Sequence, residues 1–186
     1  MNLEIHPVTP EKWPDFEKLF GKNGACDGCW CMWWRLKRSD YSRERGEGNK
    51  HAIRKIILRG DQPGLLAFLD GDPVGWCCVA PRSEFPVLER SPNLKPVDDQ
   101  PVWSIVCLFV HRPNRRKGIT SHLIKAAVQY AGKQGATIVE AYPMDKKGAA
   151  SRAMEVFTGV PSTYRRLGFK EVLRRSPMRP IMRKKI

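Results

Sequence analysis

The stretch VWSIVCLFVHRPNRRKGITSHLIKAAVQY, residues 102–130, decides the fold that we predict for this chain. Its first part, Trp103 to Val110, is an almost unbroken apolar run with several β-branched residues, which is typical of a strand buried on both faces. After Gly118 the apolar residues recur at helical spacing, as at Ile119 and Leu123. The stretch therefore predicts a buried strand, a short basic turn and a helix.

The turn carries Arg115, Arg116 and Lys117 directly before Gly118. The first amides of a helix have no partner within the helix, and the helix dipole makes this end positive. A phosphate group satisfies both conditions, and a glycine lets a ligand approach the backbone closely. The turn is therefore a candidate phosphate site, and a solvated charged turn is the alternative interpretation.

Two short segments resemble the GNAT family of N-acetyltransferases. Residues 115–120, RRKGIT, are similar to the family's acetyl-coenzyme A signature, which is Arg or Gln, two residues, Gly, one residue, and Gly or Ala. Thr120 departs from the small final residue of that pattern. Residues 164–169, YRRLGF, resemble the family's Tyr-x-x-x-Gly-Phe segment. The resemblance covers nearly the whole chain, although it is thin before residue 60.

The resemblance implies an α/β fold with a mixed, mostly antiparallel central sheet of about seven strands, flanked by helices. Two parallel strands of this sheet, Trp103–Val110 and Ala136–Tyr142, would splay apart so that the pantetheine arm of coenzyme A enters between them. Residues 1–186 are expected to form a single domain, since this length suffices for one core. The other predicted strands are 3–8, 64–69, 74–80, 169–174 and 180–184, and the other predicted helices are 11–20, 49–59 and 162–167.

The same resemblance assigns residues to acetyl-CoA, the expected co-substrate, and implies no metal. The backbone of Leu108, Phe109 and Val110 would bind the pantetheine arm. A family asparagine, expected seven residues before Tyr164, falls on Phe157, so that contact is either missing or supplied by Thr158 or Ser151. The amides of the basic turn would hold the pyrophosphate, and they belong to Arg115, Arg116, Lys117, Gly118, Ile119 and Thr120.

Acetyl transfer to an amine also needs an acid and a base. A Lys-like amine is neutral in only about one molecule in a thousand at pH 7, so a base or a chain of water molecules must remove its proton. Tyr164 is the candidate acid for the departing thiolate, and a packed ring with a solvated hydroxyl is the alternative. Glu140 is the candidate base, and a solvated residue at a strand end is the alternative. A free backbone N–H near Phe109 or Val110 would stabilise the developing oxyanion.

A segment rich in cysteine and tryptophan, CDGCWCMWWR at residues 26–35, follows the first predicted helix. Its C-x-x-C spacing is that of half a zinc site, but no second pair follows at a suitable distance. Apolar packing is the plainer interpretation. The resemblance favours an acceptor pocket lined by Trp30, Trp33 and Trp34, because such pockets are rich in aromatic side chains.

The formal net charge of +14 indicates an anionic partner, such as a phosphorylated cofactor, an acidic substrate or nucleic acid. It argues against polycationic acceptors unless acidic residues of the long connection 82–101 gather near the pocket, namely Glu84, Glu89, Asp98 and Asp99. No apolar run is long enough to span a membrane and no signal peptide is evident, so we expect a cytoplasmic protein with its six cysteines reduced and with no membrane partner.

We therefore expect an acetyl-CoA-dependent N-acetyltransferase that moves the acetyl group to a small-molecule or peptide amine by direct transfer in a ternary complex. A nucleic-acid-binding module is one alternative, suggested by the charge. A coenzyme A-binding sensor without turnover is another, because the central strand carries no carboxylate. Homodimers are common in the GNAT family, so a homodimer is a further expectation. The identity of the acceptor stays open.

Overall fold

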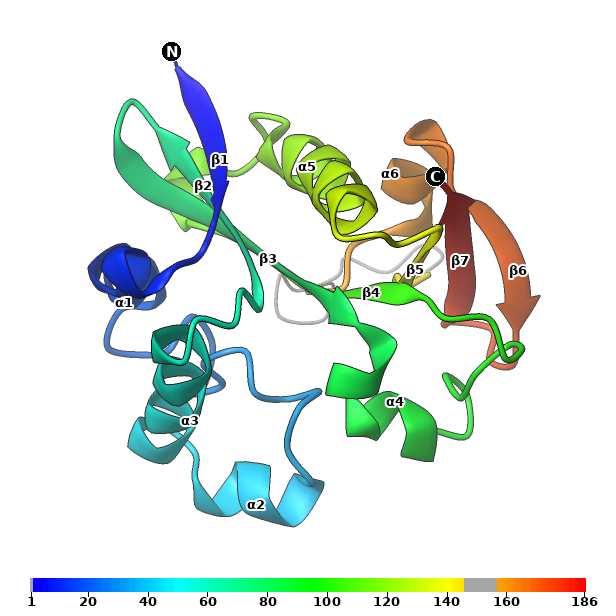
Figure 1. The fold of residues 1–186 in the computed structure, drawn as a ribbon, viewed down its shortest axis with the longest axis horizontal. Helices are drawn as coiled ribbons and strands as arrows, with labels where there is room; N and C mark the ends of the chain where they lie inside the picture. The colour runs from blue at the N-terminus through cyan, green and yellow to red at the C-terminus, as the bar shows by residue number, and fades with distance from the viewer. Residues whose placement is uncertain (1, 146–156) are drawn as a thin grey trace.

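The computed structural model of the protein describes residues 2–145 and 157–186, and it is built around one seven-stranded sheet (Figure 1). The strand order is β1-β2-β3-β4-β5-β7-β6, and among the described strands only β4 and β5 pair in parallel. The predicted fold class, a mixed and mostly antiparallel sheet with one parallel pair, is confirmed. The strands are β1 (Leu3–Pro7), β2 (Gly64–Leu69), β3 (Asp72–Pro81), β4 (Trp103–Val110), β5 (Ile138–Ala141), β6 (Lys170–Arg174) and β7 (Pro180–Lys185).

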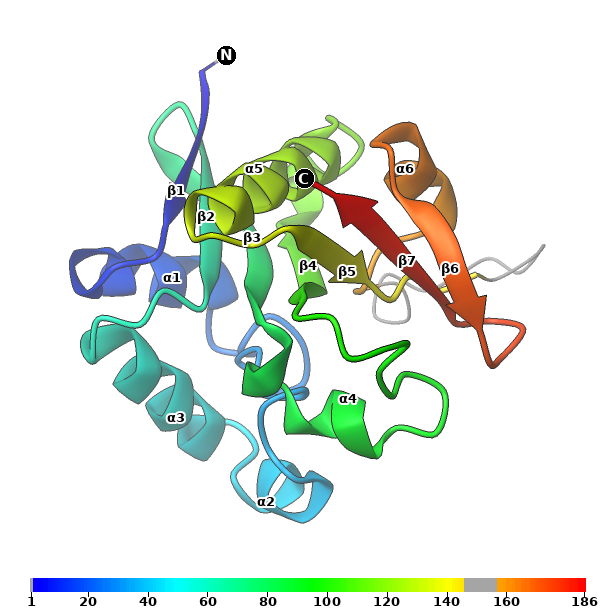
Figure 2. The same ribbon diagram turned by 45° about the vertical axis from the view of Figure 1, so that its right-hand side comes forward.

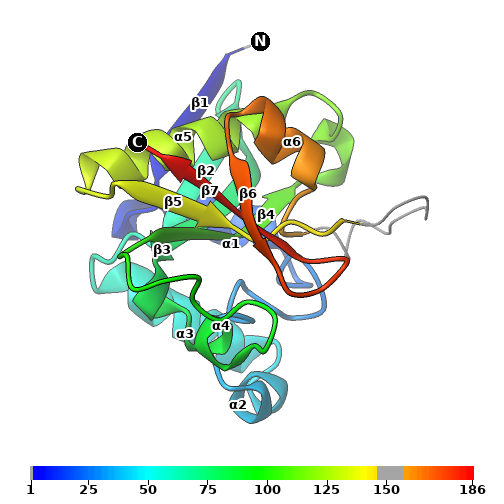
Figure 3. The ribbon, with the colours of Figure 1, turned by 90° about the vertical axis from the view of Figure 1, so that its right-hand side faces the viewer.

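The helices cover both faces of the sheet. In Figures 2 and 3, α5 and α6 lie on one side, while α2, α3 and α4 lie on the other. Short 3₁₀ turns, η1 (Pro10–Lys12), η2 (Arg82–Glu84) and η3 (Arg112–Asn114), join some of these elements. The helices are α1 (Trp13–Phe20), α2 (Arg38–Arg43), α3 (Glu47–Leu58), α4 (Pro86–Arg90), α5 (Ile119–Lys133) and α6 (Pro161–Arg166).

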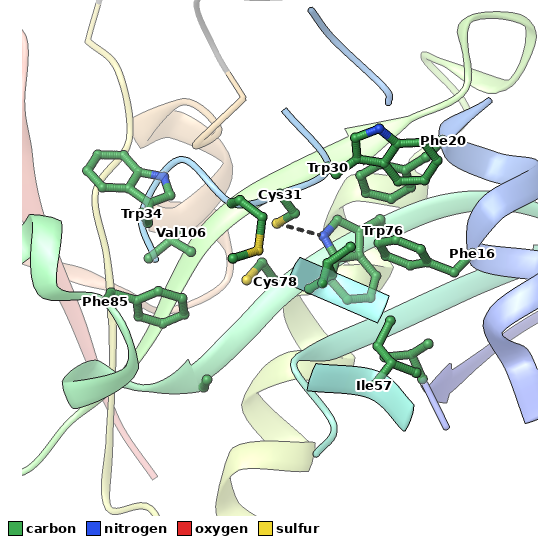
Figure 4. Packing of buried hydrophobic residues seen from close by; sticks show 14 of the residues in the cluster. Phe16, Phe20, Trp30, Cys31, Trp34, Ile57, Trp76, Cys78, Phe85 and Val106 are labelled. Carbon is green, nitrogen blue, oxygen red and sulfur yellow. Dashed lines mark hydrogen bonds between the residues drawn. The ribbon is translucent and has the colours of Figure 1, made fainter. Parts of the chain in front are cut away.

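Two apolar clusters form the core, one on each face. The side chains that α5 turns inward, including Ile119, Leu123 and Ala127, pack on one face. The other face carries an aromatic cluster to which α1 and α3 contribute, and Phe16 and Trp76 are fully buried in it (Figure 4). Helix α5 thus uses the apolar stripe that its spacing predicted, because burial of that stripe stabilises the helix on the sheet.

Two connections contain short helices. Residues 37–48, which the sequence predicts as a loop or a frayed helix, contain α2 and the first two residues of α3. In residues 82–101, which the sequence predicts as a long loop, the short helical turn predicted at 87–90 is confirmed by α4, and η2 precedes it. Pro86 stands in the first turn of α4, where the missing N–H of proline leaves no bond unmade.

The pairing of β4 with both of its neighbours changes in the middle of the strand. Its pairing with β5 covers only Trp103 to Ile105. On the other edge the register with β3 shifts, because Cys78 pairs with Cys107 while Val79 pairs with Ile105. Val106 is thus the extra residue of a β-bulge, which bends a strand and re-aims its side chains. Val106 and Cys107 both join the aromatic cluster, whereas the next residue packs on the α5 side.

Candidate active site

The basic turn before α5 presents a row of unsatisfied amides. Among the described residues, no backbone carbonyl accepts a hydrogen bond from the N–H groups of residues 116–120, and the first bonded amide is that of Ser121. Gly118 has φ of 77°, and a Cβ added there would meet nothing nearer than the His122 ring at 3.9 Å. The backbone at this point is therefore open to close approach. Such a row of amides at the start of a helix suits a phosphate oxygen.

Basic side chains surround these amides. Arg115, Arg116 and Lys117 are exposed. The Nε of Arg115 donates to the Val110 carbonyl at 2.9 Å, and the Nζ of Lys117 donates to Oδ1 of Asn114 at 3.1 Å. Arg116 has φ of 64°, a left-handed conformation that costs a non-glycine residue roughly 1–2 kcal/mol. The fold therefore maintains an unfavourable backbone at the place where the resemblance puts the pyrophosphate.

Beyond their paired part, β4 and β5 are separated by the segment Phe157–Gly159. The Leu108 N–H, predicted to bind pantetheine, donates to the Phe157 carbonyl at 2.6 Å. On the other side of the segment, the Met144 N–H donates to the Gly159 carbonyl at 2.9 Å. The splay that the resemblance implied is present, and this segment satisfies one of the backbone donors assigned to the cofactor.

Tyr164 lies beside this segment and is fully buried. Its ring packs edge-to-face on Phe169 with centroids 5.1 Å apart, and its hydroxyl donates to the Thr158 carbonyl at 3.1 Å. A Cβ built on Gly159 would lie 2.8 Å from Cε2 of Tyr164 and 3.2 Å from Cδ1 of Leu108, so the phenol borders the splay. Burial raises the pKa of Tyr164 well above its usual value, which keeps the phenol protonated at neutral pH. The alternative of a solvated hydroxyl does not apply.

Of the two residues proposed to replace the family asparagine, the structure describes one, Thr158. Thr158 is buried, and its Oγ1 accepts a hydrogen bond from Nη1 of Arg179 at 3.0 Å. The same guanidinium nitrogen donates to the Tyr142 carbonyl at 3.1 Å. The Thr158 hydroxyl is thus already engaged with the protein. Ser151 lies outside the described residues.

Glu140 sits at the centre of a buried ionic network. The carboxylate is fully buried; its Oε1 accepts hydrogen bonds from Nη1 of Arg82 at 2.8 Å and from the Tyr142 hydroxyl at 2.6 Å. Its Oε2 accepts from Nε of Arg183 at 2.6 Å. Glu140 is therefore not a solvated residue at a strand end. Because two guanidinium groups hold it, the geometry favours a role in stability over one as a free base.

The network also holds the connection between β3 and β4, residues 82–101, against the sheet. Arg82 donates through Nε to Glu89 at 2.8 Å and through Nη2 to the Leu94 carbonyl at 2.7 Å. Arg183 of β7 binds Asp98 at 2.7 Å. The sequence analysis did not identify Arg82 or Arg183. The only available signal was the number of arginines and carboxylates on connections otherwise poor in apolar residues, and this pattern does not specify partners.

The three tryptophans assigned to an acceptor pocket occupy different environments. Trp30 is buried in the aromatic cluster and stacks on Phe20 with centroids 5.6 Å apart (Figure 4). It also lines a surface pocket beside Lys18 and Lys50, so its role in acceptor binding stays a prediction. Trp33 is half-buried, and the Arg38 guanidinium lies 3.6 Å from its ring centre. Trp34 is buried beside Phe157, with ring centroids 6.2 Å apart, and so reaches the splay.

The cysteines pack as apolar side chains. The Trp76 indole N–H donates to Sγ of Cys31 at 3.2 Å, as the dashed line in Figure 4 shows. Burial raises the pKa of the Cys77 and Cys78 thiols well above the usual value, so both are neutral at pH 7. Within residues 2–145 and 157–186, no group of three or more His, Cys, Asp or Glu side chains is arranged to hold a metal ion. None of the helices in this part of the chain has the length and apolar character that a membrane crossing requires.

Comparison with known proteins agrees with this geometry. Residues 30–169 match the model of the acetyltransferase (GNAT) family. Solved structures match over nearly the full length at low identity: PaiA N-acetyltransferase from Thermoplasma acidophilum in complex with coenzyme A (17% identity, 100% of both chains, TM-score 0.58), a GNAT-family acetyltransferase from Listeria monocytogenes (11%, 99% of this chain and 95% of that one, 0.59), and a protein from Corynebacterium glutamicum described as histone acetyltransferase HPA2 and related acetyltransferase (16%, 100% and 97%, 0.55). A search of curated proteins found no match.

Proposed function

Because the chain belongs to the acetyltransferase (GNAT) family, we propose that it transfers an acetyl group from acetyl-CoA directly to the amino group of a small-molecule or peptide acceptor in a ternary complex. The observation that carries this proposal is the row of amides from Arg116 to Thr120 without backbone partners at the start of α5. The coenzyme A in the PaiA structure and the histone acetyltransferase description of the Corynebacterium protein support it.

Acetyl-CoA fits the residues around the splay. The amides of residues 116–120 would hold the pyrophosphate, with added charge from Arg115, Arg116 and Lys117. The backbone of Leu108, Phe109 and Val110 would hold the pantetheine arm, once the Phe157 carbonyl releases the Leu108 N–H. When bound, acetyl-CoA supplies a thioester that an amine can attack.

Different groups of the chain would then carry out the separate steps of the acetyl transfer. A backbone N–H near Phe109 or Val110 would donate to the carbonyl oxygen as it gains negative charge. Tyr164, protonated and next to the splay, would donate to the departing sulfur. Since the Glu140 carboxylate is held by Arg82 and Arg183, we assign removal of the amine proton to a chain of water molecules.

Charge reversal in the turn tests the cofactor site. The variant R115E/R116E should weaken coenzyme A binding by at least tenfold, because it replaces attraction to the pyrophosphate with repulsion. Calorimetric titration with acetyl-CoA at two salt concentrations measures this change. K125E, an exposed position farther along the same helix, is the matched control and should change the affinity by less than about threefold. Unaltered affinity in the double variant would exclude the pyrophosphate site.

A coenzyme A-binding protein without turnover is the second candidate. The observation that favours it is the engagement of both predicted catalytic side chains, since Glu140 is held by two arginines and the Tyr164 hydroxyl donates to Thr158. Release of free thiol from acetyl-CoA across a broad panel of amines separates the two candidates. Release above the amine-free rate supports transfer, and tight binding with no release supports the silent protein.

A further inference from the structure

Two neighbouring side chains, those of Trp34 and Arg35, bury N–H groups that have no hydrogen-bond partner among the described residues. These groups are the indole Nε1 of Trp34 and the Nε of Arg35. Both side chains are about as buried as the core, with 5% of each exposed. Such donors are uncommon in folded proteins, because burial removes water and leaves the bond unmade. A polar group of a bound ligand would satisfy both donors.

The two donors lie near the reaction centre proposed above. The Trp34 ring packs beside Phe157, whose carbonyl holds the Leu108 N–H at the splay. Figure 4 shows Trp34 on the same face of the sheet as Val106, the bulge residue of β4, and Phe85. Charge from Arg35 also acts on the Cys78 thiol, and Cys78 pairs with Cys107 of β4. A ligand group bound here would therefore sit on the acceptor side of the thioester.

The surrounding contacts hold the two side chains in place. The Arg35 guanidinium lies 4.8 Å from the centre of the Phe85 ring, and its Nη1 donates to Glu84 at 2.7 Å. The Trp34 carbonyl accepts a hydrogen bond from the Val87 N–H at 3.4 Å. Contacts with η2 and α4 thus position both donors before a ligand arrives, which lowers the entropy lost on binding.

The chemistry of the donors specifies their partner. An indole N–H only donates, and the Arg35 guanidinium, whose Nη1 is already bound to Glu84, has its Nε–H left as a charged donor that suits an anionic acceptor such as a carboxylate. A polycation is a poor fit, because three of the acids that could attract one are bound by arginines: Glu84 by Arg35, Glu89 by Arg82 and Asp98 by Arg183.

We propose that Trp34 and Arg35 bind the carboxylate of the acetyl acceptor, so that the acceptor is a primary amine with a carboxylate near its amino group, such as a free amino acid. This inference rests on the proposed function. In the transfer a C–N bond forms and the C–S bond breaks. The proton lost by the amine balances the proton gained by the thiolate.

The test compares matched pairs of amines that differ only in the carboxylate, such as phenylalanine with phenethylamine and lysine with cadaverine. We expect kcat/KM to favour the carboxylated member of the preferred pair by at least tenfold. Two variants should each reduce that preference by about tenfold. Trp34→Phe removes the indole N–H but keeps an aromatic ring. Arg35→Lys keeps the positive charge but loses the guanidinium N–H groups. W13F on α1 and R59K beyond α3 are the matched controls and should leave the preference unchanged.

Thermal unfolding separates recognition from packing. Trp34→Phe removes a donor that has no partner among the described residues but also empties part of the indole volume, so its melting temperature should fall no further than that of W13F, while KM increases for the carboxylated amine alone. A lower melting temperature without a change in KM would give Trp34 a structural role and overturn the proposal. Equal kcat/KM for the two members of every pair would overturn it too, while leaving acetyl transfer intact. If no amine is acetylated, the free protein is titrated by calorimetry with the twenty amino acids and their N-acetyl derivatives. Binding that depends on Trp34 supports the carboxylate site, and an absence of binding overturns it.

Discussion

Replacing Glu140 with glutamine should destabilise the protein strongly while leaving its chemistry largely intact. The change removes one negative charge from a fully buried site and leaves Arg82 and Arg183 facing a neutral amide, whose NH₂ group is itself a donor. Removing one partner of a buried ion pair costs about 3–5 kcal/mol. Each arginine keeps a second, more exposed carboxylate, Glu89 or Asp98, so we expect the lower end of this range. For a chain of this length, about 3 kcal/mol lowers the melting temperature by roughly 6–12 °C.

Thermal and urea unfolding measure the loss, and E89Q is the matched control. Glu89 contacts the same arginine from a half-exposed position, so its loss should cost less than about 1 kcal/mol. Adding R183Q to E140Q should recover part of the loss, because it removes one of the uncompensated charges. If E140Q melts within about 2 °C of the parent and has lost its turnover at low temperature, the carboxylate acts in the chemistry and our structural assignment is wrong.

The remaining predictions concern the splay and the buried acids. Tyr164→Phe keeps the ring but removes the hydroxyl that donates to Thr158, so we expect kcat to fall by at least tenfold with the Kd for acetyl-CoA almost unchanged, and an unchanged kcat would exclude Tyr164 as the acid. Gly159→Ala should lower both stability and acetyl-CoA affinity, since φ at this residue is 81° and the new Cβ would meet the Tyr164 ring at 2.8 Å; a fully stable variant would show that the segment moves freely. The free energy of unfolding should be highest below pH 9 and should fall as the pH rises further. Burial raises the pKa of four groups in the folded chain, those of Cys77, Cys78, Tyr142 and Tyr164. The unfolded chain therefore loses these protons at a lower pH than the folded chain, and deprotonation favours unfolding. A melting temperature that stays constant from pH 8 to pH 11 would contradict this linkage.

Local sequence patterns predicted the elements on which the fold is built. The apolar run of β4 and the helical spacing of α5 depend on contacts that any buried strand or amphipathic helix makes, so both were predicted within a residue or two. The glycine and the basic residues of the turn also predicted the row of unsatisfied amides that forms the candidate anion site, because unsatisfied amides are a property of every helix start. Connections such as residues 37–48 were harder, since short helices like α2 depend on tertiary contacts more than on propensity.

The candidate active site was predicted less completely. A sequence resemblance made Tyr164 the candidate acid, and the structure adds that its ring borders the splay and that its buried hydroxyl donates to the Thr158 carbonyl. Trp30 belongs to the core cluster and also lines a surface pocket, and composition alone does not distinguish a packing role from a binding role. The bulge at Val106 leaves no mark in the sequence, because it arises from the register between two strands.

The sequence by itself determined the strand of residues 103–110, the helix after it and the basic turn between them, since each follows from residues adjacent in the chain, and its two short motifs indicated the family and, through that resemblance, the sheet. Only the tertiary structure decided which side chains share an environment. It joins Arg82, Glu140 and Arg183 from three separate segments into one network, and it brings Phe157 to Leu108 across the splay. It also buries the Trp34 and Arg35 donors next to that splay. The physical reason is that hydrogen bonding and burial depend on distance in space, which a local pattern of residues does not encode.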